Sequence, residues 1–108
     1  MKILGMDLGT SNTYIFGAHR HSTQPTPVVL PRISAADGCV ETVILYEDDV
    51  PLLVGHLAES EYYANVPLRS RRSLRCQFKP EVGEDKSGAV RWMTDFLRML
   101  REALPPDT

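Results

Sequence analysis

The chain has 108 residues, a length that suits a single compact domain. Hydrophobic residues make up 43% of the sequence and charged residues 24%, which is enough apolar material for a core. The formal charge of −2 excludes a strong global attraction to nucleic acid or to an anionic membrane. No apolar run approaches the roughly 20 residues of a membrane-spanning helix.

Two cysteines, Cys39 and Cys76, lie far apart in the sequence and are too few for a disulfide framework. They favour a reducing compartment with two free thiols, and a disulfide between them is the alternative. The N-terminus lacks the long apolar core and the cleavage site of a signal peptide. The sequence therefore predicts a cytoplasmic protein that binds neither membrane nor nucleic acid.

The most informative stretch is the loop expected between two N-terminal strands, at residues 2–8 and 13–18. The first strand runs into Asp7. A glycine and three small polar residues then precede the next apolar run: Gly9, Thr10, Ser11 and Asn12. Such a turn arranges backbone N–H groups and hydroxyls around a concavity that suits phosphate oxygens, and a carboxylate at the strand end suits a hydrated divalent cation. The alternative is a polar hairpin turn, where these residue types are common for backbone reasons alone.

Further strands are expected downstream. Ile3, Leu4 and Leu8 predict a first strand that is apolar on both faces, as in a covered sheet. Residues 28–30 are typical of a short edge strand, because prolines surround them. Residues 40–46 are rich in β-branched side chains and favour a strand, followed by an acidic hairpin tip at residues 47–49. For that tip a solvated turn is favoured over metal binding.

Two helices are also expected. A short one at residues 57–64 stops near Pro67. A longer one at residues 88–104 stops at Pro105, and Asp95 lies on its polar face. Its apolar residues recur at helical spacing: Ala89, Val90, Met93, Phe96, Leu97, Leu100 and Leu104.

The N-terminal loop resembles the first phosphate loop of the actin-like ATPase superfamily, in the form found in DnaK-type heat-shock chaperones. In that family an Asp-Leu-Gly-Thr-Thr-Asn segment joins the first two strands of the ATPase domain, and residues 7–12 here read Asp-Leu-Gly-Thr-Ser-Asn. Residues 42–55 form an acidic hairpin that ends in Val-Gly and is similar to the family's next hairpin. Residues 58–65 resemble the helix that follows and its exit.

This resemblance implies a fold and a domain organisation. The expected class is α/β, a partial actin-like ATPase (ribonuclease H-like) lobe with a mixed β-sheet, hairpins and a long C-terminal helix. Residues 1–108 would be a single domain, an N-terminal fragment of a chaperone-type ATPase domain. Its parts would be a phosphate-loop hairpin with the following strand, a second hairpin with a short helix and an Arg-rich loop, and a helix with its tail. These parts cover residues 1–34, 35–78 and 79–108.

The resemblance also implies roles for single residues. Asp7 would be the metal ligand and a catalytic residue that positions a magnesium-bound water, and residues 9–12 would hold the phosphates of ATP or ADP with Mg²⁺. Residues 69–74 match a segment that carries a phosphate-facing catalytic Lys in the family. By spacing, Arg71 falls at that Lys, with Arg72 as the neighbouring candidate. Because Arg is a planar fork and Lys a compact point charge, this is a departure from the family pattern.

Three functions are compatible with the sequence. The first is the N-terminal fragment of the ATP-binding domain of a DnaK-like chaperone, inactive alone because the second phosphate loop, the adenosine-binding segment and the opposite lobe are missing. Its partners would be the nucleotide and the remaining lobes. The second is a stand-alone or degenerate interaction module of the same fold, a homodimer through exposed apolar faces such as the helix at residues 88–104. The third is the start of a sugar or metabolite kinase of the same superfamily.

Overall fold

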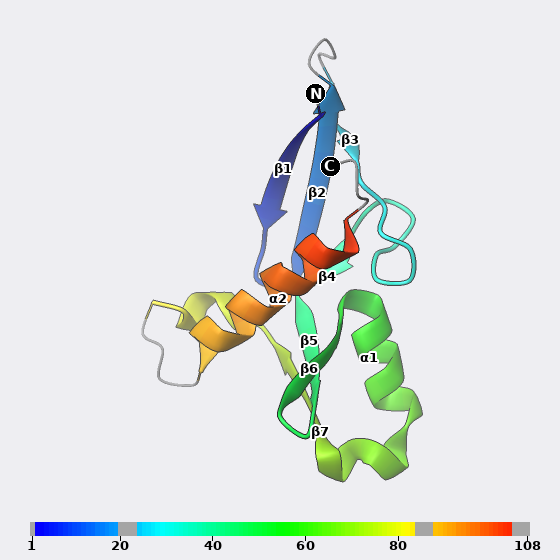
Figure 1. Ribbon diagram of the computed structural model, residues 1–108, viewed down its shortest axis with the longest axis vertical. Helices are drawn as coiled ribbons and strands as arrows, with labels where there is room; N and C mark the ends of the chain where they lie inside the picture. The colour runs from blue at the N-terminus through cyan, green and yellow to red at the C-terminus, as the bar shows by residue number, and fades with distance from the viewer. Residues whose placement is uncertain (1, 20–23, 84–87, 105–108) are drawn as a thin grey trace.

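The computed structural model describes residues 2–19, 24–83 and 88–104, and Figure 1 shows the chain as a ribbon. The described residues form strands, two α-helices and two short 3₁₀ helices. In chain order these are β1 (Lys2–Leu8), β2 (Asn12–His19), β3 (Thr26–Pro27), β4 (Val40–Glu41), β5 (Val43–Glu47), β6 (Val50–Val54), α1 (Gly55–Ala64), a 3₁₀ helix (Val66–Arg71), β7 (Arg72–Cys76), a second 3₁₀ helix (Lys79–Glu81) and α2 (Ala89–Ala103).

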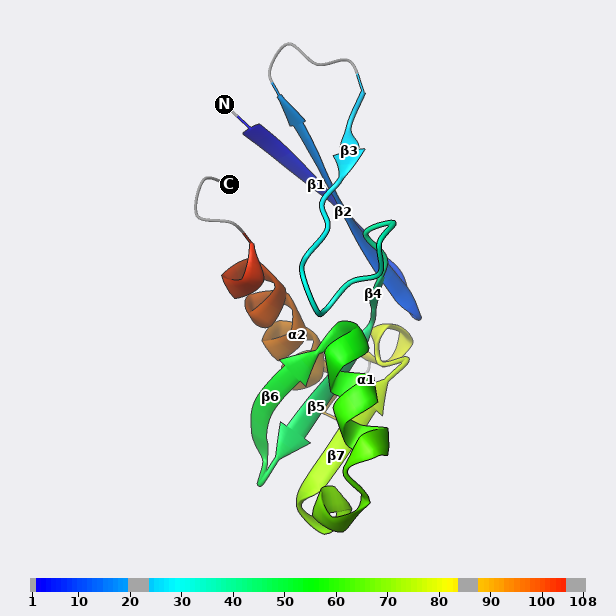
Figure 2. The ribbon, with the colours of Figure 1, turned by 90° about the vertical axis from the view of Figure 1, so that its right-hand side faces the viewer.

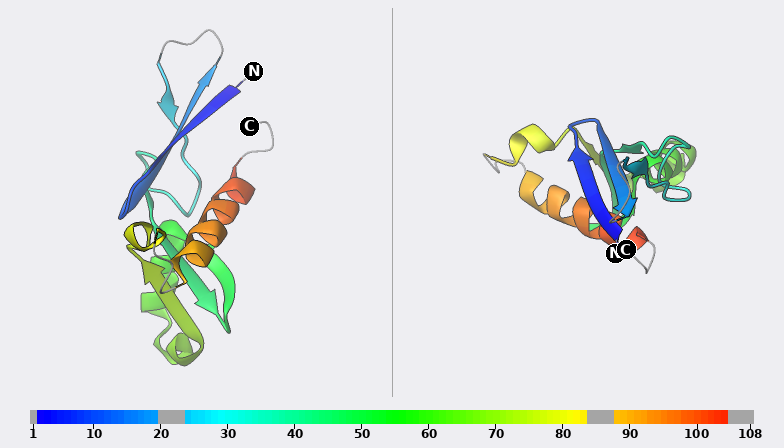
Figure 3. Two further views of the ribbon diagram at one scale, coloured as in Figure 1. Left: turned by 90° about the vertical axis from the view of Figure 1, so that its left-hand side faces the viewer. Right: turned by 90° about the horizontal axis from the view of Figure 1, so that it is seen from above.

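Sheet A is built on the N-terminal hairpin. Strand β1 pairs with β2 over its whole length, from Lys2 opposite His19 to Leu8 opposite Thr13. The other edge of β2 is shared, because β3 pairs with its C-terminal half and β4 with its first residues. The molecule measures 50 × 32 × 21 Å, and Figure 3 shows sheet A projecting at one end of it. The projecting end of sheet A therefore has few neighbours.

Sheet B has β5 at its centre, between β6 and β7, and all its pairs are antiparallel. The β5–β6 hairpin closes through Asp48 and Asp49, whose φ angles are 51° and 66°. Two successive left-handed residues form the turn whose twist matches a two-residue hairpin, and Asp tolerates that conformation better than most residues. Only Thr42 separates β4 from β5, so one extended segment leaves sheet A and enters sheet B.

Helices α1 and α2 cover opposite faces of sheet B, as Figure 2 shows. On the α1 side, Val43 and Leu45 pack against Ala58. On the α2 side, Ile44 and Tyr46 belong to a larger core. Every side chain from residue 43 to residue 46 is therefore buried, which explains why this strand is apolar without alternation.

The larger core lies where α2 meets both sheets. Helix α2 contributes Met93, Phe96 and Leu100 to this core, and Leu4 and Leu8 from β1 pack against the core from sheet A. The remaining fully or nearly fully buried apolar residues of this core are Ile15, Leu30, Val40, Ile44, Tyr46, Val54, Phe78 and Ala89. One helix thus holds the two sheets together.

Several sequence predictions are corrected by these coordinates. A mixed sheet was wrong, because every strand pair among the described residues is antiparallel. The first strand is not covered on both faces, since Ile3 and Asp7 point to an exposed outer face. The edge strand is β3, earlier than the expected residues 28–30. The coarse α/β class is confirmed, and both cysteines are free thiols.

The expected helices are both present with shifted bounds. Helix α1 begins two residues early, at Gly55, and α2 ends at Ala103; Pro105 lies outside the described residues. Asp95 does not face solvent as expected: it is buried and accepts a 2.7 Å hydrogen bond from Tyr46. Within the described ranges no helix is long and apolar enough to cross a membrane.

Candidate phosphate-binding site

The expected phosphate loop is the turn that joins β1 to β2. The N–H of Gly9 donates to the carbonyl oxygen of Asn12 at 2.9 Å, which closes the turn. A Cβ atom on Gly9 would lie 2.4 Å from that same oxygen, far inside van der Waals contact. Glycine is therefore required at position 9 by the tight backbone approach, with Thr10 and Ser11 at the tip.

A buried threonine pair anchors the turn from below. The hydroxyl of Thr42 donates to the carbonyl of Gly9 at 3.0 Å and lies 2.8 Å from the hydroxyl of Thr13. Both threonines are almost completely buried. The N–H of Thr42 also donates to the carbonyl of Ser11 at 2.9 Å. Because buried polar groups in a satisfied network rigidify their surroundings, the loop is held in one conformation before any ligand arrives.

The backbone N–H groups of Thr10 and Ser11 have no hydrogen-bond acceptor among the residues that the structure describes. Neighbouring free amides at the tip of a fixed turn are the donors that an oxyanion needs. Asn12 is positioned differently, because its side-chain oxygen accepts a 3.3 Å contact from the thiol of Cys39. The Cys39 side chain is also the main reason that the pKa of Tyr14 is raised.

Asp7 lies on the exposed outer face of sheet A, directly opposite Tyr14 and diagonal to Asn12. Its carboxylate has no partner within the described part of the chain. No three metal-binding side chains come together in that part of the chain. A single exposed carboxylate still fits Mg²⁺, which keeps several waters and takes its other ligands from substrate phosphates. Asp7 is the residue that would hold the ion.

Among the described residues, Lys79 is a cation that contacts the strand end before the turn. Its ammonium group donates to the carbonyl of Leu8 at 2.6 Å, just before the turn. The second 3₁₀ helix carries this lysine, and Phe78 beside it is fully buried in the main core. An anchored neighbour thus places a flexible positive charge at the residue where the turn begins, which favours an anion at the turn.

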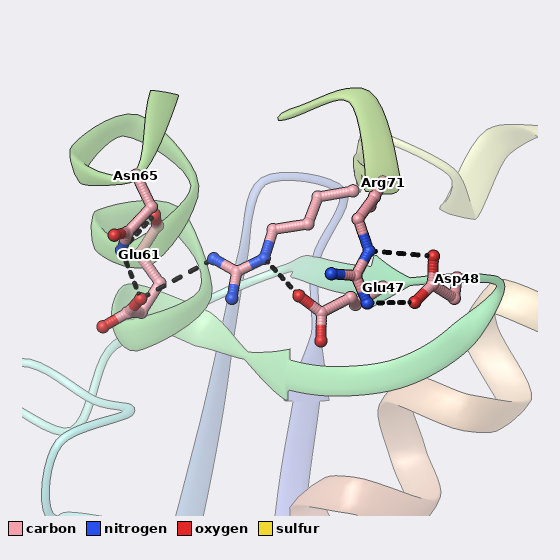
Figure 4. A network of polar contacts seen from close by, with 6 residues as sticks. Glu47, Asp48, Glu61, Asn65 and Arg71 are labelled. Atoms are coloured by element: carbon pink, nitrogen blue, oxygen red, sulfur yellow. Dashed lines mark hydrogen bonds and ion pairs between the residues drawn. The ribbon is translucent and has the colours of Figure 1, made fainter. Parts of the chain in front are cut away.

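Arg71 and Arg72 do not reach the loop. Arg71 forms a bidentate pair with Asp48 at the hairpin tip, with distances of 3.3 and 2.6 Å (Figure 4). Arg72 binds Glu47 at 3.0 Å. Strand β5 starts next to the loop and ends at Glu47, so both arginines lie roughly 15 Å away along the strand. The expected phosphate-facing role of Arg71 has no support in this geometry.

The sequence thus predicted the turn and the position of Asp7, but it did not predict that Thr42 and Lys79 contact the turn and its flanking strand. Thr42 left one signal, a polar residue inside the apolar run 40–46. No sequence signal indicated Lys79, because it follows Phe78 in an irregular segment whose path depends on how Phe78 packs.

A second polar cluster lies beside the loop. The ring of His56 is 3.7 Å from Glu41 and 3.4 Å from the hydroxyl of Ser60. These contacts are longer than good hydrogen bonds, and the His56 side chain is 65% exposed. The contact between His56 and Ser60 is explained by helix geometry, since residues four apart on α1 share a face, and Glu41 approaches His56 from β4.

Comparisons of the chain with protein-family models, with curated protein sequences and with solved structures found no significant match. The functional assignment therefore depends on the site itself.

Proposed function

We propose that the chain is the N-terminal part of an ATP-binding domain like that of DnaK-type chaperones, and that its β1–β2 turn binds the phosphates of ATP or ADP with Mg²⁺. The observation that carries the proposal is the pair of free N–H groups at Thr10 and Ser11, on a turn fixed by the Gly9–Asn12 hydrogen bond. Residues 7–12 also match the family's phosphate-loop sequence at every position but one.

In this proposal each residue of the turn has a physical task. The free amides of Thr10 and Ser11 bind phosphate oxygens, and their hydroxyls add further donors. Asp7 holds hydrated Mg²⁺ through its exposed carboxylate. Lys79 replaces Arg71 as the cation that offsets phosphate charge, because it already lies at Leu8. Phosphoryl transfer depends on positioning and charge from both sides of the phosphate, so this chain alone should bind nucleotide weakly and hydrolyse almost none.

Two other functions share the same turn. A sugar or metabolite kinase of the same superfamily would also bind phosphate there, with a different second substrate. A degenerate interaction module would keep the fold and bind no nucleotide. A binding experiment on the turn separates the module from the other two.

The test is a titration of ¹⁵N-labelled protein with Mg-ADP, followed by amide chemical shifts. We expect shifts at Thr10 and Ser11 and none at Arg71. Lys79→Ala should weaken binding by roughly tenfold, the usual value of one charge-assisted contact. The matched control is Arg71→Ala, which also removes an exposed positive charge and should leave binding unchanged.

Two results would contradict the proposal. Amide shifts at Thr10 and Ser11 that stay at baseline up to high millimolar Mg-ADP would favour the degenerate module. Steady ATP turnover above the buffer level, abolished by Asp7→Asn, would show instead that the chain is a working enzyme by itself.

A further inference from the structure

A cavity of about 390 Å³ opens beside the phosphate-binding turn, and the phosphate contacts do not use it. The described residues that line it are Ser11, Asn12, Ala35, Cys39, Glu41 and His56. Its volume falls in the range of roughly 300–1,000 Å³ that is usual for small-molecule sites. Ser11 belongs both to the tip of the turn and to the cavity wall. A ligand whose phosphate is held at the Ser11 amide would therefore have the cavity directly beside it.

The walls of the cavity are fixed by the backbone around it. In the loop before β4, the N–H of Ala35 donates to the carbonyl of Cys39 at 2.8 Å. The N–H of His56 donates to the carbonyl of Ile33 at 3.1 Å, which attaches the start of α1 to the same loop. Gly55 has a φ of 69°, and a Cβ atom there would lie 2.3 Å from that carbonyl oxygen, so glycine is required for the close approach. The cavity is thus formed before a ligand arrives, which lowers the ordering cost of binding.

Three polar side chains that line the cavity have spare hydrogen-bonding capacity, and they come from β2, β4 and α1. Asn12 uses its side-chain oxygen for the thiol of Cys39, and its NH₂ group has no acceptor among the described residues. Glu41 lies 3.7 Å from the ring of His56, which is too long for a good hydrogen bond. The carboxylate therefore keeps free acceptor sites. A ligand group that both donates and accepts would satisfy all three side chains.

Hydroxyl groups fit this set better than a second phosphate or a base does. A hydroxyl can donate to the carboxylate of Glu41 and accept from the NH₂ group of Asn12. A second phosphate is disfavoured, because the lining carries a carboxylate and its described residues include no lysine or arginine. A base binds best when it stacks on an aromatic ring, and those same lining residues include no Phe, Tyr or Trp.

We infer that this cavity is the sugar subsite of the phosphate-binding turn, and that it binds the hydroxyl groups of a ligand whose phosphate lies at the Ser11 amide. Because the position of the phosphate comes from the proposed function, the subsite rests on that function. The sugar is either the ribose of a nucleotide or a separate phosphorylated sugar. Recognition is the same for both, since Glu41 accepts from the hydroxyls and Asn12 donates to them.

A smaller hollow of about 200 Å³ also borders Ser11 and Glu41. Glu59 from α1 lines it as well, so two carboxylates border one small space. Their negative charge disfavours a ligand that carries phosphate. The larger cavity has one carboxylate and is therefore the favoured place for the sugar.

The first test compares Glu41→Ala with wild type. Amide shifts of ¹⁵N-labelled protein are followed during titration with Mg-pyrophosphate, Mg-ADP or ribose 5-phosphate. Removal of a negative charge should by itself strengthen the binding of an anion. We therefore expect Mg-pyrophosphate to bind Glu41→Ala at least as tightly as wild type, whereas a sugar-bearing probe binds it roughly tenfold more weakly. A loss confined to ribose 5-phosphate identifies a separate sugar, and a loss with Mg-ADP identifies the ribose of a nucleotide.

The matched control for charge is Glu59→Ala, which removes a carboxylate from the smaller hollow and should not weaken the binding of any probe. A second pair of variants covers the case in which Glu41→Ala misfolds. Ala35→Leu places a larger side chain in the cavity and should block the sugar probe while it spares Mg-pyrophosphate. Ala36→Leu makes the same change at the next residue, which is exposed and does not line the cavity, and should have no effect.

The possible failures give different results. If Mg-pyrophosphate shifts the turn amides but neither Glu41→Ala nor Ala35→Leu weakens a sugar probe, the sugar subsite is overturned and the phosphate site stands. An equal loss with Glu59→Ala would move the sugar to the smaller hollow and overturn the assignment to this cavity. If no probe shifts the amides of Thr10 and Ser11, the phosphate site fails, and the sugar subsite fails with it.

Discussion

Sheets A and B are both small antiparallel sheets, but they differ in how they are covered. Sheet B lies between α1 and α2 and is apolar on both faces. Sheet A is packed on one face only, and Ile3, Gly5 and Asp7 on its outer face are exposed. The difference separates two tasks. Sheet B supplies stability, and sheet A supplies an open surface with a fixed turn at one end and a free edge along one side.

The polar residues of the two sheets follow the same division. In sheet B most of them bind one another, such as Tyr46 with Asp95 and Arg72 with Glu47. In sheet A the carboxylate of Asp7 and the amides of Thr10 and Ser11 have no partner in the described ranges. Groups that are already paired stabilise the fold, whereas groups left unpaired at the surface are available to a ligand.

The largest expected difference concerns apolar side chains. Leu45→Ala in sheet B should lower the free energy of unfolding by roughly 2–5 kcal/mol, because Leu45 is fully buried and the truncation leaves a cavity. Ile3→Ala in sheet A should change it by less than about 0.5 kcal/mol. Urea unfolding of the two variants measures both free energies, provided that the unfolding free energy falls with urea concentration at the same slope in each variant. Similar losses at the two positions would mean that sheet A is covered in solution.

A smaller difference is expected between two neighbouring arginines. The Arg72 side chain is 9% exposed and lies between Glu47 and Glu61. One of its terminal nitrogens has no hydrogen-bond partner within the described residues. Arg72→Ala should cost roughly 2–4 kcal/mol, since it removes the buried stem and leaves the half-buried carboxylate of Glu47 without its ion pair, while Glu61 keeps its hydrogen bond from Asn65. Arg71→Ala removes an exposed pair and should leave the urea midpoint unchanged.

Arg72→Met separates the causes of that loss. Methionine restores most of the apolar stem without the charge. If it recovers most of the stability, packing is the main term. If Arg72→Met is no more stable than Arg72→Ala, the ion pairs with Glu47 and Glu61 are the main contribution.

The two sheets also differ in how far the sequence predicted them. The run at residues 43–46 and the Asp48-Asp49 turn are local signals, and the hairpin of sheet B formed where they indicated. The turn at residues 9–12 was predicted for the same reason. Lys79 and Asp95 were not, because their positions depend on contacts far along the chain, with Leu8 and Tyr46. Periodicity gives the face of a helix, but it cannot show that a buried tyrosine will bind a carboxylate on the polar side.

The smallest expected effect concerns two tyrosines and can be sharpened with pH. Tyr46→Phe should cost about 1–2 kcal/mol at neutral pH, because it removes the buried hydrogen bond to Asp95. Burial, and next that hydrogen bond, raise the pKa of Tyr46 in the folded protein. A raised folded pKa means that the contribution is fully present below the unfolded value of about 10 and is lost as pH rises above it.

The gap in stability between wild type and Tyr46→Phe should therefore narrow above about pH 10. Tyr14 in sheet A provides the comparison. Its pKa is raised as well, chiefly by Cys39, so the sign is the same. Because its contacts lie at a partly exposed site, Tyr14→Phe should change the unfolding midpoint little at any pH. Urea titrations of both variants from neutral to alkaline pH measure the two curves. A difference in unfolding free energy between wild type and Tyr46→Phe that stays constant across that range would mean that burial does not hold the Tyr46 phenol neutral. The Tyr46–Asp95 pair of sheet B would then respond to pH no differently from Tyr14 in sheet A.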